Sequence, residues 1–322
     1  AYKGDLWSTS LQPVYDAILL TPALLWSEAP TSGAPWDARN NHAAAIFADG
    51  SVLSLGGNAN GNHKNDVFRL TPGSTTLEQV TAAAAWSARY GLCAVVLLGT
   101  DEIVIMGGYG SGFKNDAWRS TDKGVTFVKI SDAVWAQGRA WAGCVAISAT
   151  KLFAFGGESS STVTHNDIRV SIDAGASWSD VDHASCGATP PMWSVRYGFG
   201  YTYMALFGRI VIAGGAKSYN GVYHNDIWFS QSDAKCWTLA KADVNIASDG
   251  YHGASLVTVP FGGVEALLLL GGQNKAGVYL STVQLSLDGG FIWSVVASAG
   301  GGGTWSKRYS FTAIVDSATA RL

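Results

Sequence analysis

Six histidines are the side chains best suited to hold a metal ion or to transfer a proton near neutral pH. They are His42, His63, His165, His183, His224 and His252. Neutral imidazoles that converge on one point, over a channel for example, would form a metal centre. However, His165 and His224 directly precede an Asn-Asp pair, where Lys64 and Lys114 stand in related stretches. A basic residue that recurs at one point of a repeat belongs to the scaffold, and we therefore predict no metal site and no cofactor.

Arginines recur roughly once every fifty residues, the spacing of a structural repeat, and each opens an apolar run. They are Arg39, Arg89, Arg139, Arg196 and Arg308, and Asp249 is aligned with the arginine in one further stretch. A guanidinium group forms bidentate hydrogen bonds with a carboxylate. The recurring Asn-Asp pairs supply such carboxylates at Asp66, Asp116, Asp167 and Asp226. We predict that the arginines are buried structural groups that bind these aspartates or backbone carbonyls.

Aromatic side chains are the better candidates for ligand binding, because large amphipathic rings dominate many interfaces. Four tryptophans lie three residues before an arginine, and we expect them to pack between repeats: Trp36, Trp86, Trp193 and Trp305. The candidate ligand-binding set takes residues of the post-glycine loops, of which the tyrosines are the less repetitive ones: Tyr109, Phe113, Glu158, His165, Tyr219, Tyr223 and His224. Among the five glutamates only Glu158 falls in these loops, so a two-carboxylate glycosidase centre would have to use aspartates.

The elements that position these residues repeat along the chain. Double glycines end apolar runs at 56–57, 107–108, 156–157, 214–215 and 271–272, and Asn-Asp pairs open the next runs at 65–66, 115–116, 166–167 and 225–226. Four short strands in roughly fifty residues have the size of one propeller blade. The expected blades span about 39–80, 89–130, 139–181, 196–239 and 251–296, with 308–322 and 1–28 combining into a sixth. The whole of 1–322 is predicted to be one domain.

This combination of double glycine, downstream aromatic residue and arginine-led strand resembles the kelch family of β-propellers across nearly the whole chain. The turns 120–127, 171–178 and 286–293 resemble Asp-boxes, which occur in sialidases, sortilin-like receptors and other propellers. The resemblance implies an all-β fold, a six-bladed kelch-like β-propeller of four-stranded antiparallel blades closed by pairing N- and C-terminal strands. Asp122, Asp173 and Asp288 are expected to accept backbone hydrogen bonds within their own turns.

Two enzymes linked to this resemblance define the alternative function, a glycan-acting enzyme. A sialidase holds the carboxylate of its substrate with three converging arginines, whereas the arginines here recur once per blade. Galactose oxidase carries a kelch domain and a copper site with a thioether-linked cysteine, and no cysteine here matches that residue. Sialidase-like hydrolysis and galactose-oxidase-like oxidation are therefore alternatives without assigned catalytic residues.

The two ends of the chain complete the sixth blade only in part. We expect residues 5–8 to form its third strand and residues 311–315 its innermost strand, while the place of the second strand is reached only at 321–322. An empty place would leave ladder groups unpaired, at about 1–3 kcal/mol for each buried group. Further residues, or a partner's strand added by β-augmentation, are expected to fill it, and the second case would make the protein an assembly subunit.

Composition argues against a nucleic-acid-binding protein and a membrane-spanning protein, and it bears on the location of the chain. A net charge of −3 and 14% charged residues give no basic stripe for nucleic acid, and no apolar run reaches the length of a membrane span, about 18 residues. Cys93 and Cys144 are expected to be buried free thiols, whereas Cys186 and Cys236 form a disulfide if the loop that holds Cys186 folds back. Low lysine content and the Asp-box-like turns favour an extracellular or secreted protein.

One fold hosts many functions, so function rests on the loops rather than on the architecture. The sequence predicts a non-enzymatic extracellular module, either for binding or for assembly, that contacts a protein or a glycan through the face bearing the arginines and the post-glycine loops.

Overall fold

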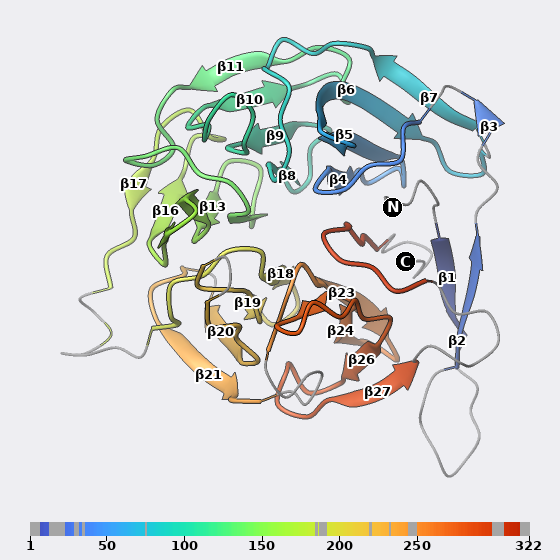
Figure 1. The fold of residues 1–322 in the computed structure, drawn as a ribbon, viewed down its shortest axis with the longest axis vertical. Coiled ribbons are helices and arrows are strands. Elements are labelled where there is room, and N and C mark those ends of the chain that lie inside the picture. Colours follow the sequence, from blue (N-terminus) through green and yellow to red (C-terminus); the bar gives the residue numbers. More distant parts are fainter. Residues whose placement is uncertain are drawn as a thin grey trace.

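The computed structural model describes residues 36–74, 76–183, 186, 192–218, 221–231, 233–243, 250–296 and 306–315, and the backbone alone of 7–12, 23–28, 32–33 and 297. The secondary-structure elements within these residues are all β-strands. Five antiparallel sheets, each with four strands of a blade, surround a common centre in a β-propeller arrangement (Figure 1). No helix in the described residues is long and apolar enough to cross a membrane.

Each blade is ordered from its innermost to its outermost strand. The first blade contains β4 (Ala43–Ile46), β5 (Val52–Ala59), β6 (Asn62–Leu70) and β7 (Thr76–Thr81), with β3 (Ser32–Gly33) parallel to β7. The second contains β8 (Cys93–Val96), β9 (Ile103–Met106), β10 (Ala117–Ser120) and β11 (Val128–Ser131). The third contains β12 (Gly143–Ala146), β13 (Leu152–Phe155), β16 (Ile168–Ser171) and β17 (Ser179–Asp180).

The last two blades follow the same order. The fourth contains β18 (Gly200–Met204), β19 (Arg209–Ala213), β20 (Ile227–Gln231) and β21 (Trp237–Lys241). The fifth contains β23 (Ser255–Phe261), β24 (Val264–Leu270), β26 (Val283–Ser286) and β27 (Ser294–Ala297). Three two-stranded pairs lie outside these ladders: β1 (Trp7–Gln12) with β2 (Ala23–Glu28), β14 (Glu158–Ser160) with β15 (Val163–Thr164), and β22 (Tyr251–His252) with β25 (Gln273–Asn274).

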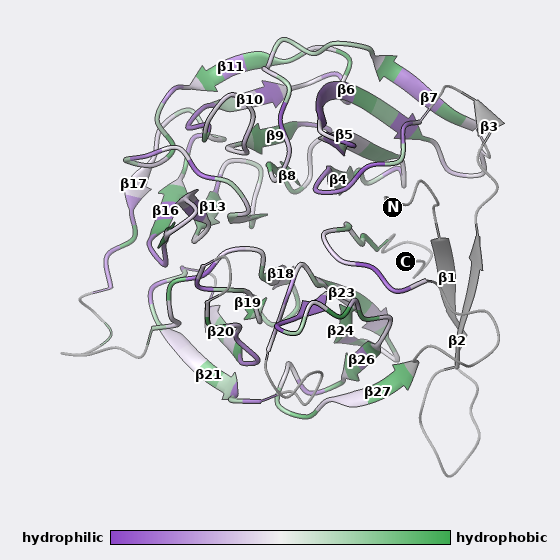
Figure 2. Cartoon of the chain, viewed as in Figure 1, coloured by the Kyte–Doolittle hydropathy of each residue, from purple (hydrophilic) through white to green (hydrophobic). Residues whose placement is uncertain are grey.

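The hydrophobic core lies between blades rather than inside any one of them. Leu53 and Leu55 of β5 share one cluster with Ile103 and Ile105 of β9, and clusters of the same kind join the later blades. Second strands such as β9 and β13 are buried on both faces, so their sequences are continuous apolar runs. Figure 2 shows this hydrophobic character on the inner strands, while the outer strands mix polar and apolar residues.

The predicted packing of the tryptophans between blades is confirmed for Trp86 and Trp193. Trp86 and Trp193 are fully buried in the clusters between blades one and two and between blades three and four. Trp36 is half-buried, lies edge-on to Phe68 and stacks with the guanidinium of Arg39. Trp305 lies outside the described residues.

The predicted closure of a six-bladed ring is not present in the described residues, which form five blades. β1 pairs with β2 along its whole length, and among the described residues neither strand pairs with the C-terminal segment, so the expected closure of the ring by N- and C-terminal strands is not seen. Residues 311–315 belong to no ladder in the described part of the chain. They nevertheless pack on the fifth blade, where Phe311, Ala313 and Val315 contact its apolar cluster.

The third-to-fourth strand turns have the predicted internal hydrogen bonds. Asp122 Oδ1 accepts from the backbone N–H of Thr126 at 2.9 Å, and Asp173 and Asp288 accept in the same way from Ser177 and Ile292. In each turn a serine hydroxyl donates to the aspartate and accepts a glycine N–H, as Ser120 does with Gly124. These aspartates are therefore structural residues of their turns.

The prediction of free thiols at Cys93 and Cys144 is wrong. The two residues form a buried disulfide between β8 and β12, with their Cα atoms 6.1 Å apart. Innermost strands of adjacent blades lie side by side around the centre, and this brings equivalent positions within bonding reach. The Tyr201 hydroxyl donates to the Cys93 sulfur at 3.1 Å. Cys186 and Cys236 form the second disulfide, the pairing that the sequence had left open.

Candidate functional site

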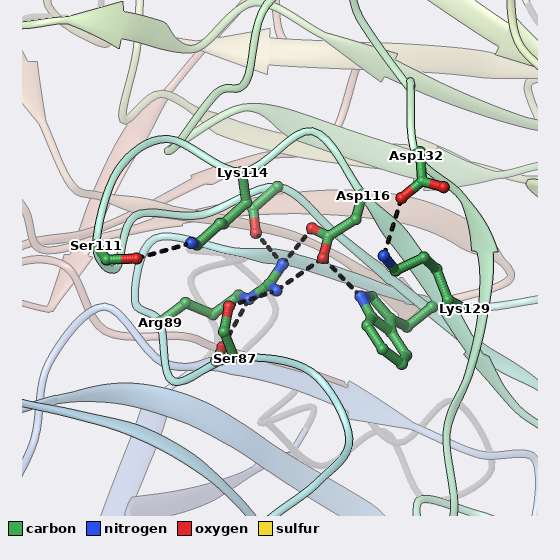
Figure 3. Close-up of polar contacts among 9 residues, drawn as sticks. Ser87, Arg89, Ser111, Lys114, Asp116, Lys129 and Asp132 are labelled. Carbon is green, nitrogen blue, oxygen red and sulfur yellow. Dashed lines mark hydrogen bonds and ion pairs between the residues drawn. The ribbon is translucent and has the colours of Figure 1, made fainter.

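Four arginines tie the start of a blade to its third strand, as predicted. In the second blade, Arg89 donates from both terminal nitrogens to Asp116, at 2.6 and 2.9 Å, and also to the Gly107 carbonyl at 3.0 Å (Figure 3). Arg39, Arg139 and Arg196 bind Asp66, Asp167 and Asp226 in the same bidentate way. All four arginines are buried, so their predicted burial and pairing are confirmed.

Electrostatics favour the ionised form of these pairs. Burial alone would raise the pKa of Asp116, but the hydrogen bonds and charge of Arg89 outweigh it and hold that pKa below its ordinary value. The pKa of Asp226 is lowered for the same reason by Arg196. Both aspartates also accept an indole N–H at 2.7 Å, from Trp118 and Trp228 respectively.

The backbones of Arg89, Arg139 and Arg196 join their blades to the preceding ones. The Arg89 N–H donates to the Lys64 carbonyl, and the Arg89 carbonyl accepts from Gly57; the later junctions repeat this pair of bonds. At the fifth blade the residue in the arginine's place is Tyr251, bonded to His224 and Gly215. The assignment of that place to Asp249 is therefore wrong, because the arginine-free blade is shifted by two residues. Arg308 makes the same two bonds with Leu280 and Gly272.

Six residues next to these junctions form a closed cycle of backbone hydrogen bonds, which we call the hydrogen-bonded cycle. Its members are Asn41, Gly91, Trp141, Gly198, Gly253 and Ser310. Each N–H donates to the carbonyl of one neighbour over 2.7–3.2 Å, and Ser310 completes the cycle between Gly253 and Asn41. All six have a left-handed backbone, with φ between 51° and 64°. That conformation costs a non-glycine residue about 1–2 kcal/mol, so Asn41, Trp141 and Ser310 are held there by the surrounding structure.

A continuous set of aromatic rings lies beside this cycle, which we call the aromatic belt. It comprises Phe113, Tyr109, His63, Tyr90, Trp141, Tyr197, His252, Tyr223, Tyr309 and Tyr279. Neighbouring centroids are 4.7–6.1 Å apart in these contacts, and most rings meet edge-to-face, the favoured geometry for aromatic pairs. The belt is therefore a preformed amphipathic surface on the arginine-bearing face.

The candidate ligand-binding residues divide between this belt and its surroundings. Tyr109, Phe113 and Tyr223 are in the belt, and Tyr219 lies outside the described residues. His165 bonds the Ser159 hydroxyl through Nε2 at 2.8 Å. Burial lowers the pKa of His224 to about 4, so this imidazole is neutral near pH 7.

Seven of the ten belt residues were not in the candidate ligand-binding set, His63 among them. Tyr90, Tyr197, His252 and Tyr309 each directly follow the arginine or its replacement, and Trp141 and Tyr279 complete the set. The sequence signal for these rings is an aromatic residue directly after the arginine. Blades one and three lack this signal, because Asn40 and Ala140 stand at that position. His183, another of the six histidines, is not part of the belt and bonds the Lys235 carbonyl in the β20–β21 turn.

The third blade interrupts the belt with a carboxyl group. Glu158 pairs with Ala140 through two backbone hydrogen bonds of 3.0 Å, as Tyr109 pairs with Tyr90 in the second blade. The residue is 8% exposed, and burial raises its pKa to about 7. No hydrogen-bond or charged partner of this carboxyl is found among the described residues.

This raised pKa predicts a stability change with pH. A carboxyl whose folded-state pKa lies above its unfolded value stabilises the fold below the unfolded pKa and loses that contribution as pH rises through the folded value. Wild type should therefore lose stability relative to Glu158→Gln between about pH 4.5 and 7, and stay level above that. We expect a difference on the order of 1 kcal/mol after allowing for solvent screening. Urea unfolding of both proteins at pH 4.5, 6 and 8 measures it, and parallel pH profiles would contradict the assignment.

Neither the arrangement of possible metal ligands nor comparison with known proteins assigns a function to the chain. No group of three or more histidine, cysteine, aspartate or glutamate residues in the described part of the chain is arranged to hold a metal ion. No protein-family model matches the sequence, and no curated protein is similar enough to count as a relative.

Proposed function

We propose that the chain is a six-bladed, kelch-like propeller whose last blade begins with residues 306–315. Two observations support this proposal. Arg308 makes the same backbone bonds to the fifth blade that Arg89, Arg139 and Arg196 make to the blades before them. Ser310 also occupies the sixth place of the hydrogen-bonded cycle, between Gly253 of the fifth blade and Asn41 of the first. The C-terminal segment, red in Figure 1, lies between these two blades. Addition of further strands to this segment, from the chain or from a partner, stays a prediction.

We further propose that the protein is a non-enzymatic, extracellular binding module and that the aromatic belt is its binding surface for a protein or glycan ligand. The observation that carries this proposal is the belt itself. Rings on a rigid scaffold need little ordering when a ligand binds, so less binding energy is lost to conformational entropy. The arginines and turn aspartates are committed to structural contacts, which leaves the belt as the functional candidate.

An extracellular location is supported by the disulfides. Cys93–Cys144 and Cys186–Cys236 join segments that are 51 and 50 residues apart in the sequence. Structural disulfides of this kind persist in oxidising compartments and are rare in the reducing cytosol.

The belt proposal is tested with immobilised glycoproteins, each in its native form and after enzymatic removal of its glycans. We expect wild-type protein to bind and the double variant Phe113→Ala/Tyr279→Ala to bind at least about tenfold more weakly, because two aromatic contacts are truncated. Leu206→Ala/Phe207→Ala is the matched control, since both residues are exposed apolar side chains of the β18–β19 turn on the opposite face.

Each outcome has a defined meaning. Binding that disappears with the glycans identifies a glycan ligand, and binding that survives their removal identifies a protein ligand. Equal affinity of the wild type and the belt variant, or loss only in the control variant, would contradict the belt proposal. Release of sugar or oxidised sugar from the bound glycoprotein would instead support the enzymatic alternative.

A further inference from the structure

One position of the aromatic belt differs from all the others. At the position directly after the arginine, the third blade carries Ala140, whereas the second and fourth blades carry Tyr90 and Tyr197. The position after the double glycine carries Glu158 in the third blade, where Tyr109 stands in the second. Ala140 and Glu158 are thus paired with each other. Among the described blades, the third is the only one with a carboxylate at either of these two positions.

Trp141, the next residue, is fixed in an unusual position beside this break. Its indole N–H donates to Asn41 Oδ1 at 2.8 Å, so the side chain reaches from the third blade to the first. One face of the indole covers Gly91, where an added Cβ would lie 2.9 Å from the ring. Tyr90 and Tyr197 meet it edge-on from either side, with centroids at 5.5 and 5.9 Å. Trp141 is only half-buried, so part of the residue stays accessible to solvent.

Glu158, whose backbone pairs with Ala140 next to Trp141, carries a carboxyl group with unused hydrogen-bonding capacity. The residue is more than nine-tenths buried, and no partner for its carboxyl group is found among the described residues. Its neighbours are already engaged, since Ser159 bonds His165 and Thr164 bonds the Lys217 carbonyl. A buried carboxyl without a partner is costly, and a ligand that supplies hydroxyl groups would offset that cost.

We propose that Glu158 and Trp141 form a saccharide subsite, in which a neutral pyranose ring stacks on the indole and its hydroxyls hydrogen-bond the Glu158 carboxyl. This inference rests on the proposed function and specifies its ligand class. The C–H face of a pyranose is apolar and fits an aromatic ring, while its rim carries the donors and acceptors that an amide or carboxyl can bind. The same positions in other blades carry Asn40, Asn58 and Gln273, which suit hydroxyl groups better than an anion or a cation.

The test is isothermal titration with neutral oligosaccharides of glucose, galactose and mannose configuration, using the full chain. Glu158→Leu keeps the approximate volume but removes the hydrogen-bonding group, and we expect it to bind the best oligosaccharide at least about tenfold more weakly. Its melting temperature should be equal to or higher than that of wild type, because an unpartnered buried carboxyl is removed. Glu78→Leu, on the outer strand β7, is the matched control and should bind like wild type.

Trp141 is tested separately, because its truncation also affects the hydrogen-bonded cycle. Trp141→Phe keeps a ring but loses the bond to Asn41, and we expect about three- to tenfold weaker binding with the fold retained. Unchanged oligosaccharide affinity in both Glu158→Leu and Trp141→Phe would overturn the subsite, even where the belt variant Phe113→Ala/Tyr279→Ala loses binding and the proposed function stands.

Two further outcomes separate this inference from the proposed function. Binding of tetramethylammonium but of no oligosaccharide, abolished by Glu158→Leu, would replace the saccharide with a cationic ligand and overturn the inference. Binding of deglycosylated protein alone would also overturn it while leaving the belt proposal intact. If neither glycoproteins nor oligosaccharides distinguish wild type from the belt variant, both proposals fail.

Discussion

Replacing Arg196 by alanine is expected to lower the free energy of unfolding by about 3–5 kcal/mol, the range for breaking a buried ion pair from one side. The Arg196 side chain is fully buried, and it binds both carboxylate oxygens of Asp226 and the Gly214 carbonyl. Alanine would leave Asp226 largely desolvated, with the hydrogen bond from the Trp228 indole remaining, and the Gly214 carbonyl would lose its arginine donor. Denaturant unfolding of both proteins measures the loss.

Two further variants make this prediction decisive. Arg196→Lys keeps the charge but not the bidentate geometry, and it should fall between wild type and Arg196→Ala. Arg119→Ala removes a partly exposed arginine that lies 3.7 Å from Glu102, and it should cost less than about 1 kcal/mol. Unchanged stability of Arg196→Ala together with lost ligand binding would reassign this arginine from the scaffold to the binding site.

Removing the disulfide between the second and third blades is expected to be the other large effect. Cys93 and Cys144 are 51 residues apart, and chain entropy alone assigns about 4 kcal/mol to a cross-link of that span. Both sulfurs are buried in the core cluster between the blades, so the double change Cys93→Ala/Cys144→Ala also leaves a cavity worth about 1 kcal/mol more. Thermal and denaturant unfolding should both show the loss.

The second disulfide provides a matched comparison. Cys186 and Cys236 are 50 residues apart, so chain entropy predicts almost the same contribution. This bridge joins a connecting segment to the β20–β21 turn rather than two innermost strands. Cys186→Ala/Cys236→Ala should therefore cost less than the buried pair by about the cavity contribution. An equal or larger loss would show that burial between the blades adds nothing.

Repeated residues carried most of the fold prediction. The double glycines must adopt positive φ, as Gly107 and Gly108 do at 64° and 99°, so their recurrence marks the same turn in each blade. The arginine–aspartate pairs were predictable because bidentate geometry needs both partners at fixed places in every repeat. The fifth blade was misaligned because charge was followed there instead of Gly253, which matches Gly91 and Gly198 in the cycle.

Contacts between residues that are distant in the sequence could not be predicted from the repeats. The bond between Cys93 and Cys144 depends on how closely two innermost strands approach, and spacing along the chain does not encode that distance. Trp141 was missed because its role depends on a left-handed backbone and on Asn41, 100 residues away. Glu158 was selected as the loop-face glutamate, but its unpartnered burial could be seen only in the folded chain.

The central claim is that the aromatic belt on the arginine-bearing face is where the ligand binds. A crystal structure of the protein with the tightest-binding oligosaccharide from the titrations tests it most directly. We predict density for a sugar ring over Trp141, with a hydroxyl within hydrogen-bonding distance, about 2.5–3.0 Å, of the Glu158 carboxyl. Density for the ligand at the turns of Asp122, Asp173 or Asp288, on the opposite face, with the belt free of sugar, would contradict the claim.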